Sequence, residues 1–331
     1  MKSRRLFLSA VIAATLSVSS LAHAEDMRIG LVVKALGIGF FEAANKGAQE
    51  AAEELGGVEV IYTGPTETTA EGQIEVINSL VSQKVDAIAV SANDTDALVP
   101  MLKKAQDRGI KVISWDSGVA PEGRQIHLNP SSNALIGEMN IKLAADALKA
   151  SGAEKGDIAI LSATPTSTNQ TIWIEEMKKV LPNYPQLNLV TTVYGDDMAD
   201  KSYRETQGLL QSQPDLKVIV APTSVGIVAA AQAVEDAGKV GKVYVTGLGL
   251  PSELAGHVKA GSVKSFAIWN PIDLGYAATT IAYNLVKGNA TDKEVGMGRM
   301  GTAKLEEDGS AAMAEPFIYD ASNVEEFAKI F

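Results

Sequence analysis

Polar residues, and in one case a proline, follow several short apolar runs of this sequence. Runs such as AIAV and VIVA have the composition of buried strands. Because ligands of open parallel sheets bind beyond the carboxyl ends of the strands, residues at such positions could surround one ligand. A single polar residue there more often caps the following helix, but a whole set is harder to explain by capping. The residues at these positions are Lys34, Ser91, Asn93, Asp116, Pro222 and Asn270.

These residue types suit a small neutral polyol. A carboxylate such as Asp116 accepts hydroxyl protons, an ammonium such as Lys34 donates to hydroxyl oxygens, and amides do both. Hydrogen bonds to charged groups contribute roughly 1.5–3 kcal/mol each. The aromatic pair Phe40 and Phe41 could offer a flat apolar face to the C–H groups of a sugar, although we expect core packing to take one of the two rings. We also expect Trp115 in the core.

Enzyme, metal and cofactor chemistry finds little support. The sequence has no cysteine, and of its three histidines His23 lies in the export signal described below, so only His127 and His257 remain. This excludes thiolate and multi-histidine metal sites and Cys–His catalysis. It has no Walker A sequence, no G-x-S-x-G and no D-x-D-x-D-G calcium loop. Lys34 could form a Schiff base, as in aldolases, but a role as a hydrogen-bond donor beside Asp116 is preferred. We therefore expect a binding protein with no metal and no cofactor.

The first residues have the pattern of an export signal. Three basic residues within the first five precede an apolar stretch over residues 6–18, and Ala-His-Ala at 22–24 supplies a cleavage pattern. The apolar stretch is too short to span a bilayer as a permanent helix. The sequence therefore predicts a signal peptide over residues 1–24 and a mature protein located in the periplasm.

The remaining chain is acidic and long enough for two domains. Removal of residues 1–24 takes away three basic residues, so the formal net charge moves from −11 to −14. An acidic chain without a basic tract is a poor candidate for binding nucleic acid or anionic lipid. Without cysteine there is no disulfide framework, so stability must come from conventional hydrophobic cores.

Short β-branched runs alternate with longer helical patterns. The runs are continuously apolar, which is typical of parallel strands covered by helices on both faces. One β-α-β-α-β series over 28–127 and a second over 157–247 predict two doubly wound, Rossmann-like α/β lobes with a cleft between them; a single large sheet remains the alternative. Strands are expected at 28–34, 58–63, 87–91, 111–116, 157–163, 189–194, 218–222, 243–247 and 266–269, and helices at 41–55, 72–83, 96–108, 133–150, 168–180 and 224–238.

The motifs of this chain resemble those of type I periplasmic binding proteins. More narrowly, they resemble the branch that holds the rhamnose-binding and autoinducer-2-binding proteins. The resemblance implies two lobes with three connections, closure about a hinge, and delivery of the ligand to an ABC importer. The motifs are Lys34-Ala-Leu-Gly-Ile-Gly-Phe-Phe, Thr63-Gly-Pro-Thr, Gly72-Gln, Val90-Ser-Ala, Trp115-Asp116-Ser and Ala221-Pro222.

The resemblance also implies lobe boundaries and partners. The first lobe is expected to hold residues 25–128 plus 271–297, and the second lobe residues 129–270 plus 298–331. The implied partners are a small neutral sugar and an inner-membrane ABC permease, with a chemoreceptor as a further option. We expect a monomer that binds no nucleic acid.

Individual site residues follow from the same resemblance. Lys34, Phe41, Asp116, Gln170 and Pro222 match residues of the autoinducer-2 binders. The resemblance therefore adds Asn169, Gln170 and Ser224 to the residues chosen from strand ends.

Three positions depart from the autoinducer-2 pattern. Asn169 and Asn270 stand where that family has aspartates, and Ser224 stands near its alanine. An amide supplies donors as well as an acceptor, so the pattern of hydroxyl groups that is recognised should differ. The segments around Asn169 and Asn270 resemble the rhamnose-binding group. The sequence thus favours L-rhamnose as the ligand and leaves autoinducer-2 as the alternative.

Overall fold

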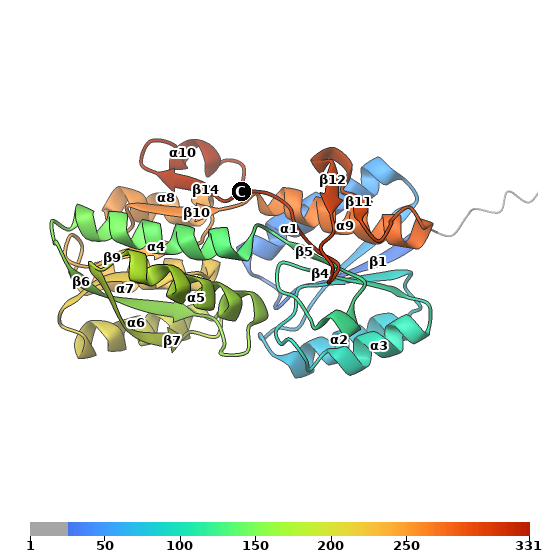
Figure 1. Cartoon of the computed structure of the whole chain (residues 1–331), viewed down its shortest axis with the longest axis horizontal. Helices are drawn as coiled ribbons and strands as arrows, with labels where there is room; N and C mark the ends of the chain where they lie inside the picture. The colour runs from blue at the N-terminus through green and yellow to red at the C-terminus, as the bar shows by residue number, and fades with distance from the viewer. Residues whose placement is uncertain (1–25) are drawn as a thin grey trace, which may run out of the picture.

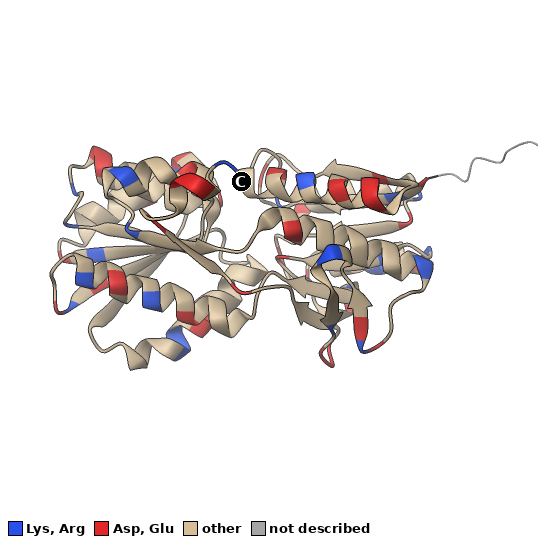
Figure 2. Ribbon diagram, turned by 90° about the horizontal axis from the view of Figure 1, so that it is seen from above, with Lys and Arg blue, Asp and Glu red and all other residues tan. Residues whose placement is uncertain are grey.

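The computed structural model of the protein describes residues 26–331, which form two α/β lobes lying end to end along the long axis (Figures 1 and 2). Each lobe has its own parallel sheet with helices on both faces. The α/β class and the two doubly wound lobes expected from the sequence are confirmed, and the alternative of one large sheet is wrong. The expected signal peptide, residues 1–24, lies outside the described residues.

The sheet of the first lobe has six parallel strands in the order β13-β5-β4-β3-β1-β2. All four residues of β3 are buried, as their apolar run requires. The strand order reverses between β1 and β3, so the crevice beyond their carboxyl ends is the switch point at which ligands of such sheets bind. The strands are β1 (Met27–Val32), β2 (Val58–Thr63), β3 (Ala87–Val90), β4 (Lys111–Trp115), β5 (Ile126–Asn129) and β13 (Ser310–Ala312).

The sheet of the second lobe has four parallel strands in the order β7-β6-β8-β9, with a corresponding switch point between β6 and β8. A parallel bridge between Leu248 and Ala267 continues it to β10, which pairs antiparallel with β14. The strands are β6 (Gly156–Ser162), β7 (Leu187–Tyr194), β8 (Leu216–Ala221), β9 (Tyr244–Gly247), β10 (Ser265–Ile268) and β14 (Phe317–Asp320).

Helices cover both faces of each sheet. In the first lobe, Figure 1 shows α1 and α9 on one face and α2 and α3 on the other. Threonine side chains cap α2 and α7, and Asn270 caps α9. The helices are α1 (Gly39–Leu55), α2 (Ala70–Ser82), α3 (Val99–Asp107), α4 (Asn133–Ala150), α5 (Thr168–Val180), α6 (Ala199–Ser212), α7 (Ser224–Asp236), α8 (Pro251–Ala260), α9 (Pro271–Lys287) and α10 (Val324–Phe327), with 3₁₀ turns η1 (Pro121–Gly123), η2 (Leu181–Asn183) and η3 (Gly298–Met300).

Helices α1 and α9 pack with their backbones in contact. A Cβ atom on Gly47 would overlap the carbonyl oxygen of Ile272, and a Cβ atom on Gly275 would overlap the carbonyl oxygen of Ala44. Glycine is therefore required at both positions for this close approach. The contact fixes the first turn of α9 against α1. Helix α9 begins where the chain re-enters the first lobe, and α1 begins at the crevice.

The tail corrects one expected lobe boundary. Strands β11 (Glu294–Gly296) and β12 (Thr302–Lys304) form a hairpin, after which β13 pairs with β5 through the register Ser310↔His127. The expected boundary places residues 298–331 wholly in the second lobe. Strand β13 nevertheless belongs to the first sheet, because it supplies backbone partners to the edge of β5. Only β14 and α10 return to the second lobe. The chain therefore crosses between the lobes before α4, before α9 and before β14.

Within residues 26–331, none of the helices has the length and apolar character needed to cross a membrane.

Candidate ligand-binding site

A cavity lies in the crevice between the lobes, beyond the carboxyl ends of β1, β4, β6 and β8. The space in it that protein atoms do not fill, including the part open to solvent, is about 410 Å³. Its walls come from both lobes. They are formed by Lys34, Ile38, Phe40, Phe41, Asp116, Asn169, Gln170, Trp173, Asp197, Pro222, Thr223, Ser224, Leu248, Ile268 and Trp269.

The Lys34 ammonium bridges the two lobes. Lys34 follows β1 and is 3% exposed. Its Nζ donates to Ser167 Oγ at 2.7 Å and to Asn169 Oδ1 at 2.9 Å. Both acceptors lie at the start of α5 in the second lobe, so a side chain of the first sheet is bound directly across the crevice. An ammonium has three donors, and these two bonds leave one for a further partner.

Asp116 faces the same point from the end of β4. Its Oδ2 accepts from Ser91 Oγ at 2.7 Å, and its Oδ1 accepts from Asn169 Nδ2 at 3.1 Å. Burial raises the pKa of Asp116, while the nearby Lys34 ammonium and the two hydrogen bonds oppose that rise. Asp116 has a φ of 58°, a left-handed conformation that is uncommon outside glycine and is often found at functional sites.

Asn169 and Gln170 present amides from the first turn of α5. Asn169 Oδ1 accepts from Lys34, and its Nδ2 donates to Asp116, so this one amide uses both of its polar ends across the crevice. Gln170 Oε1 accepts from Ser162 Oγ and from Ala163 N, both at 2.7 Å. The Gln170 carbonyl is therefore fixed to the end of β6, and no hydrogen bond from its Nε2 occurs within residues 26–331.

Aromatic rings form the apolar wall. Phe40 and Phe41 are both buried and both line the cavity, so core packing does not remove either ring from it. Phe40 meets Trp269 edge to face, with ring centroids 6.2 Å apart, and Trp173 meets Trp269 at 5.7 Å. Trp115 packs behind Phe41 at 5.8 Å and is fully buried, in the core position expected for it.

Most residues predicted for the site lie together, and three lie elsewhere. Eight of the predicted residues line the cavity: Lys34, Phe40, Phe41, Asp116, Asn169, Gln170, Pro222 and Ser224. Ser91 does not line the cavity, and its hydroxyl donates to Asp116, which does. Asn93 lies outside the cavity wall, because its amide donates to the carbonyl oxygens of Lys34 and Thr69 at 2.9 and 3.2 Å.

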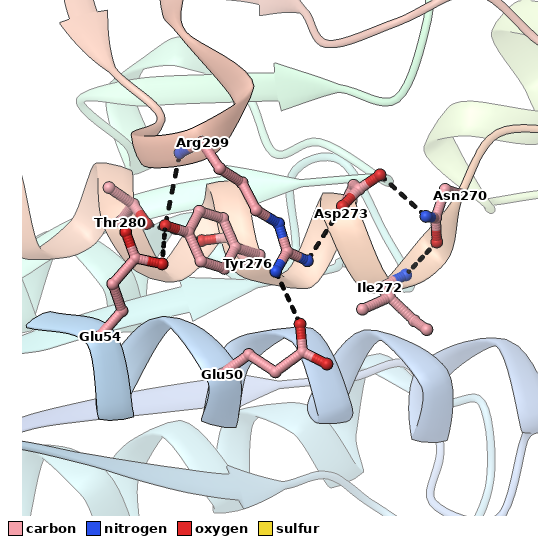
Figure 3. Close-up of polar contacts among 8 residues, drawn as sticks. All are labelled: Glu50, Glu54, Asn270, Ile272, Asp273, Tyr276, Thr280 and Arg299. Carbon is pink, nitrogen blue, oxygen red and sulfur yellow. Dashed lines mark hydrogen bonds and ion pairs between the residues drawn. The ribbon is translucent and has the colours of Figure 1, made fainter. Parts of the chain in front are cut away.

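Asn270 also lies outside the cavity, and both its amide oxygen and its amide nitrogen bond to other residues. Its Oδ1 accepts from Ile272 N at 3.0 Å, which caps α9, and its Nδ2 donates to Asp273 at 2.8 Å (Figure 3). The capping interpretation, considered for every strand-end residue, describes Asn270 better than contact with a ligand.

Figure 3 shows how the tail is attached beside Asn270. The Arg299 guanidinium lies over the Tyr276 ring, 4.2 Å from its centroid, and donates to Glu50 at 2.8 Å and to Asp273 at 3.0 Å. Glu50 lies on α1 and Asp273 on α9, so η3 joins both helices. Asp273 in turn accepts from Asn270, which connects this cluster to the crossing between the lobes.

Sequence reasoning missed part of the cavity. Asp197 was not predicted, although the run Gly195-Asp196-Asp197 follows an expected strand in the same way as the chosen residues do. The apolar residues of the wall carry no such signal, because one buried leucine or isoleucine resembles any other. Within residues 26–331, no three His, Cys, Asp or Glu side chains are grouped so that they could hold a metal ion.

Comparison with known proteins identifies the family. A model of the periplasmic binding protein domain matches residues 29–290. The chain belongs to the periplasmic binding protein family. The crevice between two parallel-sheet lobes, with polar groups converging from both, has the type I architecture of that family.

Several relatives of this periplasmic binding protein have known structures or curated descriptions. A solute-binding protein of an ABC transporter from Clostridium phytofermentas, with L-rhamnose bound, is 37% identical with a TM-score of 0.86, covering 92% of this chain and 99% of that one. LsrB from Clostridium saccharobutylicum, in complex with AI-2, is 26% identical with the same TM-score, covering 91% and 99%. The D-ribose/D-allose-binding protein of Pseudomonas aeruginosa is 30% identical over 74% of this chain and 79% of the relative. The first and the third of these relatives are described as binding proteins, and LsrB is described in complex with AI-2.

Proposed function

We propose that this protein is the periplasmic substrate-binding component of an ABC importer for a neutral sugar, and that L-rhamnose is its ligand. The observation that carries the proposal is the Lys34–Asn169–Asp116 network, in which donors and acceptors of both lobes converge on one cavity. The similarity to the L-rhamnose-bound protein from Clostridium phytofermentas supports the choice of sugar.

The network explains how a sugar would favour the closed arrangement. Lys34 and Asp116 belong to the first lobe and Asn169 to the second, so a sugar hydroxyl that donates to Asp116 and accepts from Lys34 also lies beside Asn169. A ligand that contacts both lobes binds the closed form better than the open form, and this difference in affinity shifts the population toward closure.

The apolar side of the cavity suits a deoxy sugar. L-rhamnose carries a methyl group in place of one hydroxymethyl group, and the rings of Phe40 and Trp269 with Leu248 offer an apolar wall for it.

Calorimetric titration with L-rhamnose and L-mannose tests this proposal, because the two sugars differ only in the hydroxyl group on C6. L-rhamnose should bind, and L-mannose should bind at least about tenfold more weakly, since a hydroxyl buried without a partner costs roughly 1–3 kcal/mol. L-fucose and ribose serve as further comparison sugars. Equal affinity for L-rhamnose and L-mannose would remove the argument from the apolar wall.

Autoinducer-2 is the second candidate ligand. Lys34, Asp116 and Gln170, which match residues of the autoinducer-2 binders, all line the cavity, and the AI-2-bound relative has a TM-score of 0.86. The same titration with autoinducer-2 decides between the two ligands. Tighter binding of autoinducer-2 than of L-rhamnose would replace the sugar in the proposal and keep the role as a binding protein.

A Lys34-dependent aldolase is the competing interpretation from the enzyme class. The Lys34 ammonium donates two hydrogen bonds, to Ser167 and Asn169, which is the behaviour of a binding group. L-rhamnose recovered unchanged after long incubation with the protein is the expected result. Conversion of the sugar, together with its trapping on Lys34 by borohydride, would establish the enzyme instead.

Location and partners complete the proposal. The signal pattern over residues 1–24 and the family of the chain support export to the periplasm. The partner is then an inner-membrane ABC permease, to which the closed form delivers the sugar, and a chemoreceptor is a further candidate. We propose that the protein acts as a monomer whose lobes move about the three crossings described above.

A further inference from the structure

The cavity holds a second carboxylate that sequence reasoning did not select. Asp197 follows β7 in the second lobe and lines the cavity together with Asp116 of the first lobe. Both residues have left-handed backbones, with φ values of 52° and 58°, and the neighbouring Asp196 has the same conformation with a φ of 56°. Such a conformation is uncommon outside glycine, is adopted by aspartate more readily than by most residues, and recurs at functional sites. The two lobes thus each contribute one acidic side chain to the same space.

The Asp197 carboxylate is held in place by one of its oxygens. Thr223 Oγ1 donates to Asp197 Oδ1, and the same hydroxyl oxygen accepts from Gly226 N at 3.2 Å to cap α7. Within residues 26–331, no protein group donates a hydrogen bond to the second oxygen, Oδ2. The neighbouring Asp196 differs, because it pairs with Lys201 at 2.6 Å. Asp197 is therefore oriented by the protein and keeps acceptor capacity for a ligand.

The charges around the cavity do not balance. Among the residues that line it, Lys34 supplies one positive charge, and Asp116 and Asp197 supply two negative charges. Lys34 interacts with Asp116, and Asp197 contributes to the raised pKa of Asp116 by repulsion, after burial, which is the main cause. The cavity thus carries one carboxylate more than its cation neutralises. Like charges that face one cavity repel each other, although Asp197 is only partly buried and its repulsion is the last of the causes that act on the pKa of Asp116.

We propose that Asp197 is a specificity-determining residue of this site: its free carboxylate oxygen accepts a hydroxyl proton of the sugar from the side opposite Asp116, and its uncompensated charge excludes sugar acids. The inference rests on the proposed function and specifies its substrate class as polyols without an anionic group. A neutral sugar donates one hydroxyl proton to each lobe's carboxylate, whereas an aldonate or uronate brings a third negative charge into the cavity.

The test uses the Asp197→Asn variant, with L-rhamnose and L-rhamnonate as probes in calorimetric titrations. Asparagine has nearly the same shape and tolerates the left-handed backbone, so this substitution removes the charge with little change in conformation. Asp200→Asn is the matched control. Asp200 is exposed at the start of α6 and lies outside this cavity, so its substitution removes the same charge elsewhere. Thermal unfolding of both variants checks that the fold is kept.

The wild-type protein should bind L-rhamnose and should bind L-rhamnonate at least about 100-fold more weakly. In Asp197→Asn, the affinity for L-rhamnose should fall about tenfold, as expected for the loss of a charge-assisted hydrogen bond. The affinity for L-rhamnonate should instead rise at least about tenfold, so the ratio of the affinities for L-rhamnose and L-rhamnonate should fall at least about 100-fold. Asp200→Asn should change neither quantity by more than about twofold.

The outcomes separate this inference from the proposed function. If the wild-type protein binds L-rhamnose but Asp197→Asn leaves both the affinity and the ratio unchanged, the role of Asp197 is overturned and the proposed function stands. An equal effect of Asp200→Asn would also overturn it, because general charge would then be the cause. If the wild-type protein binds none of the neutral sugars, the proposed function fails, and the inference fails with it.

Discussion

The ammonium of Lys34 donates a hydrogen bond of 2.9 Å to Asn169 Oδ1 across the crevice between the lobes. Lys34 follows the first strand of one sheet, and Asn169 lies in the first turn of α5 in the other lobe, so the bond exists only when the lobes are together. Further hydrogen bonds cross the same crevice, including Thr68 Oγ1 to Asp196 O at 2.6 Å and Thr95 Oγ1 with Thr168 Oγ1 at 3.0 Å. Closure is thus stabilised by polar groups placed at strand and helix ends.

Replacing Lys34 by methionine should weaken sugar binding about 10- to 100-fold, because methionine keeps the length of the side chain and removes the charge-assisted donor. Titration calorimetry with L-rhamnose measures the loss. Lys46→Met is the matched control, since Lys46 is an exposed lysine on α1. Equal affinities of the Lys34 variant and the wild-type protein would show that the ammonium takes no part in binding.

Sugar affinity should fall in mildly acidic solution because of Asp116. Burial raises the pKa of Asp116 above its ordinary value of 3.8, so its folded form takes up a proton at a higher pH than an exposed aspartate. The ionised carboxylate accepts hydroxyl protons more strongly than the protonated form does, so affinity is greatest above the raised pKa and decreases as the pH falls through it. Titrations between about pH 7 and pH 4 should show this loss in the wild-type protein. A flat, weaker profile is expected for Asp116→Asn, and an identical slope in that variant would contradict the assignment.

Two Gly→Ala substitutions should have opposite effects on stability, one at the contact between α1 and α9 and one on the exposed side of α6. A Cβ on Gly275 would overlap the carbonyl oxygen of Ala44, so Gly275→Ala should lower the free energy of unfolding by about 1–3 kcal/mol. Gly208 lies in the exposed middle of α6 with no atom within 4 Å of an added Cβ, so Gly208→Ala should stabilise the protein by up to about 1 kcal/mol. Urea denaturation measures both. A Gly275→Ala protein as stable as the wild type would mean that the helices can separate at no cost.

The Arg299 cluster should stabilise the first lobe modestly and in a salt-dependent way. The guanidinium and its partners Glu50 and Asp273 remain partly exposed, at 40%, 36% and 25% of the side-chain area, so solvent screens both ion pairs. Arg299→Met should therefore lower the free energy of unfolding by only about 1 kcal/mol. The difference from the wild type should shrink in about 1 M salt. Arg204→Met, at an exposed position on α6, is the control, and a loss unaffected by salt would assign the effect to packing on Tyr276 alone.

His127 should make stability depend on pH. Burial, followed by the charge of Arg124, lowers the pKa of His127 from 6.5 to about 4. The neutral ring fits its partners, since Nε2–H can donate to Asn129 Oδ1 while Nδ1 accepts from Ser114 Oγ. Because the unfolded chain binds a proton more readily, stability is complete above pH 6.5 and is lost as the pH falls toward about 4, by roughly 3 kcal/mol in total.

Urea denaturation at a series of pH values, compared between the wild-type protein and His127→Gln, isolates this contribution. The difference in pH slope between the two proteins belongs to the histidine, because carboxylates such as Asp116 titrate in both. Parallel slopes would show that His127 is protonated equally well in the folded and unfolded chains.

Much of the fold could be predicted because its signals are local. The run AIAV is apolar at every position and is β3, and the helices expected at 133–150 and 168–180 have those bounds in the structure. Strand β13 could not be predicted, since three residues carry no periodicity and their place was decided by the unpaired edge of β5. The lobe boundary in the tail was wrong for that reason.

The sequence by itself determined which groups stand at the ends of buried strands, because apolar runs set the strands and a polar residue marks where each run ends. It placed Lys34, Asp116 and Pro222 around the cavity in this way. Only the tertiary structure decided which polar groups remain free to meet a ligand. Asn270 and Asn93 are consumed by a helix cap and by backbone carbonyls, while Asp197 keeps one oxygen free. The physical reason is that a hydrogen bond depends on the direction and distance of a partner from another part of the chain, and charge and residue type do not encode that partner.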